Sequence, residues 1–487
     1  MSDLDAYIDQ LNQQPQLAAL IAPLVTIIEQ QAQRIAYLEA ELAQLRAQLN
    51  QNSQNSHKPP SSEGYRKAPA LPKTKTGRRG GQPGHQGNTL KMVEDPDTVD
   101  EQRPQHCLGC GHPLMGIDPE AVERRQVFDL PEPRLVVHEY RRPVCRCPGC
   151  GQRNQAAFPV SAPVQYGPRV WALSTLLHHD YNVPLEKVSQ FFGDVFGYRL
   201  NGATVLSATH RSYDALALSQ ETICNALPVA PVVHVDETGL RCEGRLHWMH
   251  VASTEALTHY FVHPKRGLSA LKTTASVLPD YTGQVVHDCW TSYFRFTKAG
   301  HSLCGAHLIR ELRAQAEQGA PWAEAMIALL LEAYGQTQQH GAHCPAQYRQ
   351  MKQRYFGLLR QGLKFHRPPV ASSKRGRKKR GKARSLIWRL IHHHKAVWAF
   401  ARSAEVPFTN NQAERDLRMV KGKQKVNGGF GTVSGAVVFA RIRGFCSTAR
   451  KQGKQVFKEL SRALQEPEYV LIQQPSAVSS SLLCNGL

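Results

Sequence analysis

Three acidic residues stand where carboxylates commonly bind divalent metal ions. Asp236 and Asp288 each close a short apolar segment with the composition of a strand, VVHV and QVVH. Glu414 falls in the first turn of a helix predicted within NNQAERDLRMVKGK. Magnesium ions prefer carboxylate oxygens, and two such ions about 3.5–4 Å apart can hold the attacking and leaving oxygens of an in-line displacement at phosphorus. The three residues therefore predict a two-metal site for phosphodiester chemistry.

The helix that carries Glu414 also carries basic residues on the same face. A Thr or Asn among residues 409–411 can cap its amino terminus. Arg418 and Lys421 follow Glu414 by four and seven positions, so the three side chains share one face of the helix. A carboxylate placed there can reach a metal ion while its basic neighbours reach a phosphate backbone.

The acids lie far apart in the chain, so the fold has to bring them together. Beyond Pro231 three strand patterns follow one another, VVHVDET, LHWMHVAS and LTHYFVH, and a helical segment, KRGLSALKTTASVL, precedes a fourth, GQVVHDCW. In open sheets ligands bind at the carboxyl ends of strands, so neighbouring strands would place Asp236 beside Asp288. This order is that of the ribonuclease-H-like fold, which we predict over residues 230–460. A single acidic residue at a strand end is common and does not by itself predict a site. The prediction depends on the acidic residues together with this order of strands.

Two knuckles of the form Cys-x-x-Cys-Gly recur in the chain, at Cys107, Cys110, Cys147 and Cys150. The glycines let the backbone turn tightly around an ion, and four thiolates suit structural Zn²⁺. Other residues near enough to substitute as ligands are Cys145, His106 and His112. The segment between the knuckles, RRQVFDLPEPRLVVHEYRRPV, has the alternation of a strand pair. We predict a zinc-binding module over residues 106–160, against the alternative of buried cysteines without metal.

The overall charge points to a polyanionic partner. The chain has 60 Lys+Arg against 39 Asp+Glu, a formal net charge of +21, and nucleic acid is the first candidate. Its 487 residues exceed what one hydrophobic core usually supports, so several domains are expected. No apolar run approaches the roughly 20 residues of a membrane-spanning helix, and the amino terminus MSDLDAY is acidic where a signal peptide would be basic. We expect a cytoplasmic, nucleoid-associated protein without a membrane partner.

An apolar stripe with steps of three and four residues, broken only at Gln31, runs through the first fifty positions. Its members are Leu24, Ile28, Ile35, Leu38, Leu42, Leu45 and Leu49. The spacing predicts a coiled-coil helix over residues 1–50 and hence a homodimer or higher oligomer. A single amphipathic helix packed on its own core is the alternative. Residues 51–105 are rich in Ser, Asn, Pro, Gly and Lys, which predicts a flexible basic linker that either contacts phosphates or is merely solvated.

Residues 165–227 show helical patterns throughout, with Gly197 as a stop signal. Two of these helices joined by a turn resemble a helix-turn-helix, in which Thr204–Arg211 would be the recognition helix. A plain helical subdomain is the alternative, and the pattern does not separate the two.

A series of motifs resembles the transposases of the insertion sequence 66 family. They are the amino-terminal leucine-rich helix, NSQNSHKPPSS, GGQPGHQG, the two cysteine knuckles, VHVDETG, HDCWTSYF, CGAHLIREL and NNQAERDLR. These pieces run over most of the chain and occur in the family's order, which makes the resemblance specific.

The resemblance implies a DDE transposase, with the triad carried over as Asp236 from VDET, Asp288 from HDCW and Glu414 from NQAER. Such an enzyme holds two Mg²⁺ (or Mn²⁺) ions per active site, nicks DNA at the ends of its element and joins the freed 3′ hydroxyl to target DNA. Relatives carry a helical insertion between the second Asp and the Glu, and AMIALLLEAY and LIWRLIHHHKAVWAFA fit one at about 305–405. Companion proteins from the same element are further expected partners.

The predicted insertion contains the dense basic run KRGRKKRGKAR, usually a solvated loop but here expected to contact DNA phosphates. The contacts predicted there are Lys374, Arg375, Arg377, Lys378, Lys379 and Arg380. Cys304 and His307 form a Cys-x-x-His without a matching second pair, so we predict a structural role near the active site, with Arg310 as a DNA contact. Residues 465–487 are expected to form a tail.

The expected fold class is α+β and multidomain. A ribonuclease-H-like mixed-sheet core with a helical insertion follows a coiled coil, a zinc-binding module and a helical DNA-binding region. The competing hypothesis is a non-catalytic zinc-containing DNA-binding protein that occupies element ends. It accounts for the charge and the zinc but not for the order of the acids. A structure-selective nuclease or resolvase on the same fold is a third reading.

Overall fold

The computed structural model describes residues 15–49, 89–366 and 381–472. The chain divides into two compact units. The first comprises Met1–Ala68, Ala162–Gln190 and Leu200–Leu487, and the second comprises Pro69–Ser161 and Phe191–Arg199. Most of the predicted linker 51–105 and the basic residues 374–380 lie outside the described residues.

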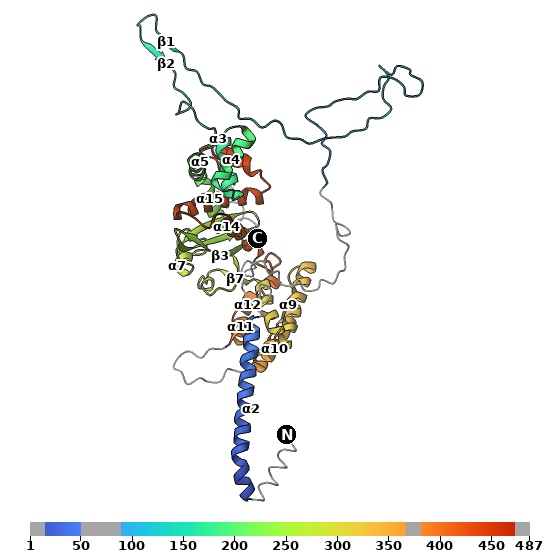
Figure 1. Cartoon of the computed structure of the whole chain (residues 1–487), viewed down its shortest axis with the longest axis vertical. Helices are drawn as coiled ribbons and strands as arrows, with labels where there is room; N and C mark the ends of the chain where they lie inside the picture. Colours follow the sequence, from blue (N-terminus) through green and yellow to red (C-terminus); the bar gives the residue numbers. More distant parts are fainter. Residues whose placement is uncertain (1–14, 50–88, 367–380, 473–487) are drawn as a thin grey trace, which may run out of the picture. The chain divides into compact units, whose positions relative to one another are not determined.

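A five-stranded mixed sheet forms the centre of the first unit (Figure 1). Its strands are β3 (Val232–Cys242), β4 (Arg245–Ser253), β5 (Thr258–His263), β6 (Gln284–His287) and β7 (Gly300–Leu303), in the spatial order β5-β4-β3-β6-β7. β3, β4 and β5 are antiparallel, whereas β6 runs parallel to β3 and β7 parallel to β6. The α+β class is confirmed, as are the four predicted strands. β7 has no strand pattern of its own that sequence reasoning detected.

A two-residue turn sets the register between β3 and β4. Glu243 and Gly244 both have positive φ, 51° and 72°, the backbone of a type I′ hairpin turn. Along β3 successive side chains point to opposite faces, so Val233 and Val235 enter one core while Leu240 and Cys242 enter another. β3 is therefore buried on both faces, as the central strand of a covered sheet should be.

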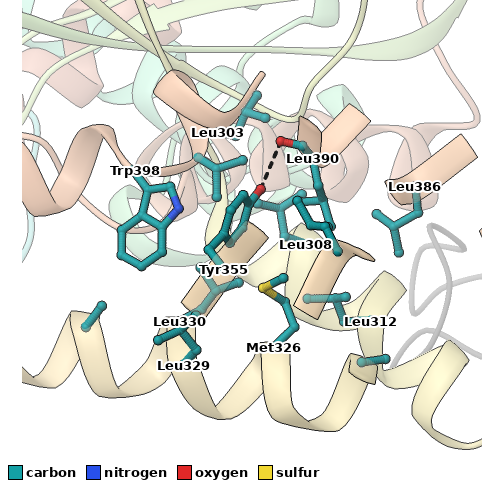
Figure 2. Close-up of a cluster of buried hydrophobic side chains, with 14 of the residues drawn as sticks. Leu303, Leu308, Leu312, Met326, Leu329, Leu330, Tyr355, Leu386, Leu390 and Trp398 are labelled. Carbon is teal, nitrogen blue, oxygen red and sulfur yellow. Dashed lines mark hydrogen bonds between the residues drawn. The ribbon is translucent and has the colours of Figure 1, made fainter. Parts of the chain in front are cut away.

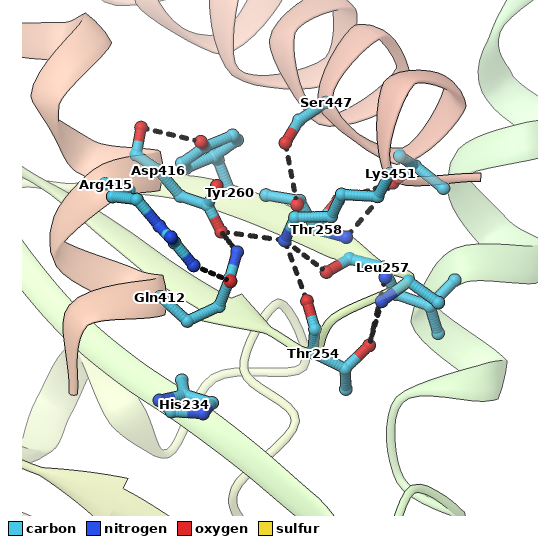
Figure 3. A network of polar contacts seen from close by, with 12 residues as sticks. His234, Thr254, Leu257, Thr258, Tyr260, Gln412, Arg415, Asp416, Ser447 and Lys451 are labelled. Atoms are coloured by element: carbon cyan, nitrogen blue, oxygen red, sulfur yellow. Dashed lines mark hydrogen bonds and ion pairs between the residues drawn. The ribbon is translucent and has the colours of Figure 1, made fainter. Parts of the chain in front are cut away.

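Helices α14 (Asn411–Asn427) and α15 (Val433–Lys451) cover the face that holds Leu240 and Cys242. A polar network fastens both helices to the edge of the sheet (Figure 3). Lys451 Nζ donates to Asp416 Oδ2 of α14 at 2.8 Å and to the carbonyl of Thr254 at 2.8 Å. Tyr260 of β5 donates its hydroxyl to the carbonyl of Asp416 at 2.9 Å. Because the network is buried, each of these bonds resists sliding of α14 along the sheet.

A helical segment separates β7 from α14 and has its own core (Figure 2). It comprises α8 (Gly305–Ala316), α9 (Pro321–His340), α10 (Pro345–Phe365), α11 (Lys382–His392), α12 (His394–Val397) and α13 (Ala399–Arg402). Trp322, Met326, Tyr355 and Trp398 are nearly inaccessible to solvent, and each such side chain contributes about 1.5–3 kcal/mol by burial. Tyr355 satisfies its hydroxyl by donating to the carbonyl of Leu390 at 2.9 Å. The segment thus folds around itself and returns the chain to the sheet at α14.

A helical region precedes the sheet, as predicted. Its elements are α3 (Pro168–Thr175), the π-helical η2 (Leu176–Asp180), α4 (Leu185–Phe196), α5 (Gly202–Ala215) and α6 (Ala217–Ala226). The Asn201 side chain caps α5 by accepting from the backbone of Ala203. The buried carboxylate of Asp180 pairs with Arg443 and Arg450 of α15, which ties η2 to the helices on the sheet.

Two local predictions are wrong. The strand pair expected within 124–144 is absent, because this stretch is almost wholly exposed and interrupted by Pro131 and Pro133; the pair that forms is β1 (Val144–Arg146) with β2 (Arg153–Gln155). The helix expected from KRGLSALKTTASVL is reduced to the single turn α7 (Leu268–Leu271).

The longest described helix is α2 (Pro15–Leu49), which carries the predicted heptad stripe. No helix within the described ranges combines the length and apolar character needed to cross a membrane.

Candidate active site

The pairing of β3 with β6 sets Asp236 level with the point where β6 ends and Asp288 follows. Asp236 lies in the middle of β3, which continues to Cys242, so the predicted strand end at Asp236 is wrong. The two strands are parallel and His234 is paired with Val286. Asp236 and Asp288 each follow that pair by two residues, so they extend the register at equal height. In-register residues of parallel neighbours point to the same face, and Asp236 shares the parity of Leu240 and therefore the face covered by α14. The sequence patterns predict strand ends, but only the strand order makes them adjacent.

Asn410 anchors the start of α14 against β3. Its side chain is fully buried, donates from Nδ2 to the carbonyl of Val235 at 2.9 Å, and contacts His234 Nδ1 through Oδ1 at 2.9 Å. Its backbone N–H donates to Cys304 Sγ at 3.2 Å. Asn410 thus contacts Val235, the residue before Asp236 on β3, and it lies four residues before Glu414 in the chain. It therefore holds the start of α14 against the part of β3 that contains Asp236.

The three acids influence one another electrostatically. Burial raises the pKa of Asp236 well above its ordinary value, and the charges of Glu237, Asp288 and Glu414 raise it further, while a backbone hydrogen bond from Glu237 opposes them. Burial also raises the pKa of Glu414; the guanidinium groups of Arg310 and Arg418 lower it, and Asp288 raises it. The charges of the acids therefore influence one another, but in the described part of the chain the oxygens of Asp236, Asp288 and Glu414 are not brought within 4.8 Å as one set of ligands.

The donor set fits a hard divalent cation. Asp236 and Asp288 each accept one backbone hydrogen bond through Oδ1, from Glu237 at 2.8 Å and from Trp290 at 2.9 Å, which orients the carboxylates. Glu414 Oε1 is buried and accepts no hydrogen bond from the described residues. Carboxylate oxygens are the ligands that Mg²⁺ and Mn²⁺ prefer, and a divalent charge would offset the repulsion between the acids.

Sequence reasoning missed a second acid beside Asp236. Glu237 points to the opposite face of β3, and its side chain is only 1% exposed. Arg266 pairs with it at 2.6 Å, and Tyr293 donates its hydroxyl to the other carboxylate oxygen. The Arg266 guanidinium also lies over the ring of Trp290, 4.4 Å from its centroid. The dipeptide Asp-Glu in VDET was the available signal, since a buried strand rarely holds two neighbouring acids without partners for both.

The Cys-x-x-His pair lies against the third acid. Cys304 precedes α8, and His307 Nδ1 lies 3.5 Å from Glu414 Oε1. Burial raises the pKa of the Cys304 thiol to about 11. The predicted position near the acids is thus correct, and the fold adds Glu414 as a neighbour that the spacing of the motif could not reveal.

The predicted DNA contacts fall into two groups. Arg310 is half-buried on α8, and Arg418 is exposed on α14; both lie close enough to Glu414 to lower its pKa. Lys421 is exposed and donates one hydrogen bond to the carbonyl of Gly239 at 3.1 Å, which leaves its other protons for solvent or phosphate. The six basic residues predicted between 374 and 380 lie outside the described residues.

Each cysteine pair of the second unit forms a knuckle of the same shape. The backbone of Gly111 donates to the carbonyl of Cys107 at 2.9 Å, as that of Gly151 does to Cys147, and both glycines have a φ of 74°. Hydrogen bonds from the backbone two and three residues ahead lower the pKa of Cys107 and of Cys147, which favours thiolates. In the described part of the chain the two knuckles are not brought within 4.8 Å as one set of ligands.

Comparison with known families agrees with these features. The family described as "Transposase IS66 family" matches residues 163–438, more than half of the chain and all of the sheet. The "zinc-finger binding domain of transposase IS66" matches residues 104–151, which hold both knuckles and support a Zn²⁺ ion. A "Family of unknown function (DUF6444)" matches residues 6–91. No curated protein matches the chain.

Proposed function

Because this chain belongs to the IS66 family of transposases, we propose that it is a DDE transposase that cleaves the ends of its insertion element and joins the 3′ hydroxyl to target DNA. The observation that carries the proposal is the parallel pairing of β3 with β6 up to His234 and Val286, which supports Asp236 and Asp288, each two residues further on, as neighbours. Glu414 stands in the first turn of α14, held by the Asn410 anchor. The three residues are the proposed triad.

The strand order supports a ribonuclease-H-like core. Numbered along the chain from β3, the strands lie in the order 3-2-1-4-5, with three antiparallel strands followed by two parallel ones. The sequence patterns predicted the order of the first four strands along the chain, whereas their order in space and the strand β7 come from the structure. The helical segment α8–α13 would then be the insertion between the second Asp and the Glu.

Asp236, Asp288 and Glu414 would hold two Mg²⁺ or Mn²⁺ ions. When bound, such ions activate water or a 3′ hydroxyl and offset the charge that develops on the phosphate oxygens. The chain's own residues orient the carboxylates through the backbone N–H groups of Glu237 and Trp290. Arg310 and Arg418 would hold the DNA backbone next to Glu414, with Lys421 and the basic run 374–380 contributing further phosphate contacts.

The test compares DNA binding with strand cleavage in single variants. Asp236→Ala, Asp288→Ala and Glu414→Gln should each bind element-end DNA as the wild type does, yet cleave labelled DNA more than about 100-fold more slowly in Mg²⁺. Asp280→Asn is the matched control, since its carboxylate is 88% exposed and belongs to the same unit but not to the triad. Cleavage at the wild-type rate by any triad variant would refute the assignment. A wild type that binds ends but never nicks them would favour the non-catalytic alternative.

The remaining modules have proposed roles in assembly and binding. Cys107, Cys110, Cys147 and Cys150 would hold a structural Zn²⁺, because four thiolates leave no open coordination position. The apolar stripe of α2 is exposed at Ile28, Ile35, Leu38, Leu42 and Leu45, which supports pairing with a second copy as a coiled coil.

The helix α5 contains the predicted recognition segment. Its inward face is packed at Val205 and Ala208, and its outward face leaves Ser207 and His210 exposed. Arg211 stacks on Trp171 of α3, 4.6 Å from the ring centroid. A DNA contact by α5 would therefore use the exposed residues around His210, with Arg211 partly engaged within the protein.

A further inference from the structure

Three potential metal ligands of different chemistry meet where α8 and α14 begin. The thiol of Cys304, the imidazole of His307 and the carboxylate of Glu414 each offer one donor atom, and all three atoms lie within 4.8 Å of one another. Within the described residues no other group of three or more such donors is as close. The chain contributes two ligands from one short motif and the fold supplies the third from α14.

The spacing suits ligands of a common ion better than a direct hydrogen bond. His307 Nδ1 and Glu414 Oε1 are 3.5 Å apart, longer than a good hydrogen bond between nitrogen and oxygen. A tetrahedral ion bonded to nitrogen and oxygen at about 2.0–2.2 Å separates those two atoms by roughly 3.3–3.6 Å. The Cys304 sulfur accepts a hydrogen bond from the backbone N–H of Asn410 at 3.2 Å, an interaction that stabilises a metal-bound thiolate.

We propose that Cys304, His307 and Glu414 form a binding site for one thiophilic divalent cation, of the class of Zn²⁺ or Co²⁺. Thiolate and imidazole select such ions over Mg²⁺, so this site differs in chemistry from the oxygen-only triad. Binding displaces the thiol proton to solvent and leaves the fourth coordination position to water. Three protein ligands with one open position are typical of exchangeable sites and unlike the closed four-thiolate knuckles.

The site shares Glu414 with the proposed triad. An ion held by Cys304 and His307 draws the Glu414 carboxylate toward α8, so it competes with the Mg²⁺ pair for the same oxygen atoms. This consequence rests on the proposed function, whereas the site itself does not. A thiophilic ion would therefore act as an inhibitor of Mg²⁺-dependent cleavage.

Titration of the full-length chain with Co²⁺ tests the site. Only one equivalent of Zn²⁺ per chain is added first; it fills the four-thiolate knuckles, which bind it more tightly than a site of three protein ligands and retain it against Co²⁺. Co²⁺ should then bind with one equivalent and produce a thiolate-to-cobalt charge-transfer band with the intensity of a single Co–S bond. The readout needs no DNA, so a chain that fails to cleave DNA can still show the band, and a chain that cleaves DNA can lack it.

Single substitutions identify the residues that bind the cobalt ion and produce the band. Cys304→Ser should abolish it, while His307→Gln should weaken Co²⁺ binding at least about tenfold without removing the sulfur. Cys446→Ser is the matched control, because Cys446 is also buried but belongs to α15. The urea unfolding midpoint of each variant establishes that it is folded. If Cys304→Ser does not fold, His307→Gln provides the test of the site. The proposal is overturned if wild type shows no band, if Cys304→Ser keeps it, or if His307→Gln binds Co²⁺ as tightly as wild type.

Discussion

Replacing Arg266 by Met should destabilise the sheet, because it leaves a buried carboxylate without its charge partner. Arg266 reaches Glu237 Oε1 through two nitrogens, at 2.6 and 2.7 Å, and the Glu237 side chain is 1% exposed. Removing one partner of a buried ion pair costs about 3–5 kcal/mol. Arg266 itself is 40% exposed, so water screens part of that cost, and Tyr293 still donates to the carboxylate. We expect the free energy of unfolding to fall by about 2–3 kcal/mol.

Two further variants separate charge from packing. Arg266→Lys keeps a positive charge but loses the second hydrogen bond and the planar contact with Trp290, so we expect a smaller loss of about 1–2 kcal/mol. Combining Arg266→Met with Glu237→Gln removes both charges. The double variant should be more stable than the sum of the two single losses predicts, by at least about 1 kcal/mol.

Urea unfolding followed by tryptophan fluorescence provides the measurement. Trp248 and Trp290, two of the six tryptophans, flank the Arg266 guanidinium, at 5.1 and 4.4 Å from their ring centroids, so part of the fluorescence change reports on this part of the sheet. The chain has more than one unit, and the transition of the sheet is therefore fitted separately. A loss below about 0.5 kcal/mol for Arg266→Met, or single losses that simply add in the double variant, would refute the reasoning.

Four further outcomes follow from the structure. Asp180→Asn should lower the free energy of unfolding by about 3 kcal/mol or more, since the buried carboxylate neutralises two arginines of α15; a loss below about 1 kcal/mol in urea would contradict this. Burial lowers the pKa of His178 to about 4 in the folded chain, below its ordinary 6.5, so the unfolded chain takes up the proton first and stability falls as the pH drops from 6.5 toward 4. Between pH 6.5 and 5 this amounts to at most about 2 kcal/mol, and His178→Asn should flatten the pH dependence of Tm. Gly305→Ala should lower the free energy of unfolding by about 1–3 kcal/mol, because a Cβ at this position would meet Phe408 Cζ at 2.2 Å. Adding Phe408→Leu to Gly305→Ala should raise the Tm again. A Gly305→Ala variant with the Tm of the wild type would exclude the clash. Cys107→Ser should lower the zinc content, measured by elemental analysis, by about one ion per chain, and an unchanged zinc content would assign that ion to other ligands.

Local patterns of the chain predicted the elements that bear the candidate site. Alternation of apolar residues identified the strands that contain Asp236 and precede Asp288, although β3 continues past the predicted end at Asp236 to Cys242; cap and charge signals identified the helix of Glu414. The cysteine knuckles were predicted in the same way, since their turn depends on a few consecutive residues. In residues 124–143 no apolar face is buried, and there the alternation of apolar and polar residues wrongly predicted a strand pair.

Other features depended on partners that are remote in the chain. β7 is four residues long and becomes a strand by pairing with β6. Arg266 reaches Glu237 from beyond β5, and Asn410 reaches Val235 across the whole helical segment. The residues next to these partners in the sequence do not predict the contacts, because the contacts form only when the sheet and α14 pack together.

The sequence by itself determined which short segments become strands, helices and knuckles, because periods of two and 3.6 residues and tight turns depend on adjacent side chains. It also determined the family, through motifs in a fixed order. Only the tertiary structure decided that β3 and β6 are neighbours in parallel register and that Glu414 lies beside the Cys304–His307 pair. Those juxtapositions follow from burying both faces of β3 at once, a condition that involves residues from the whole chain.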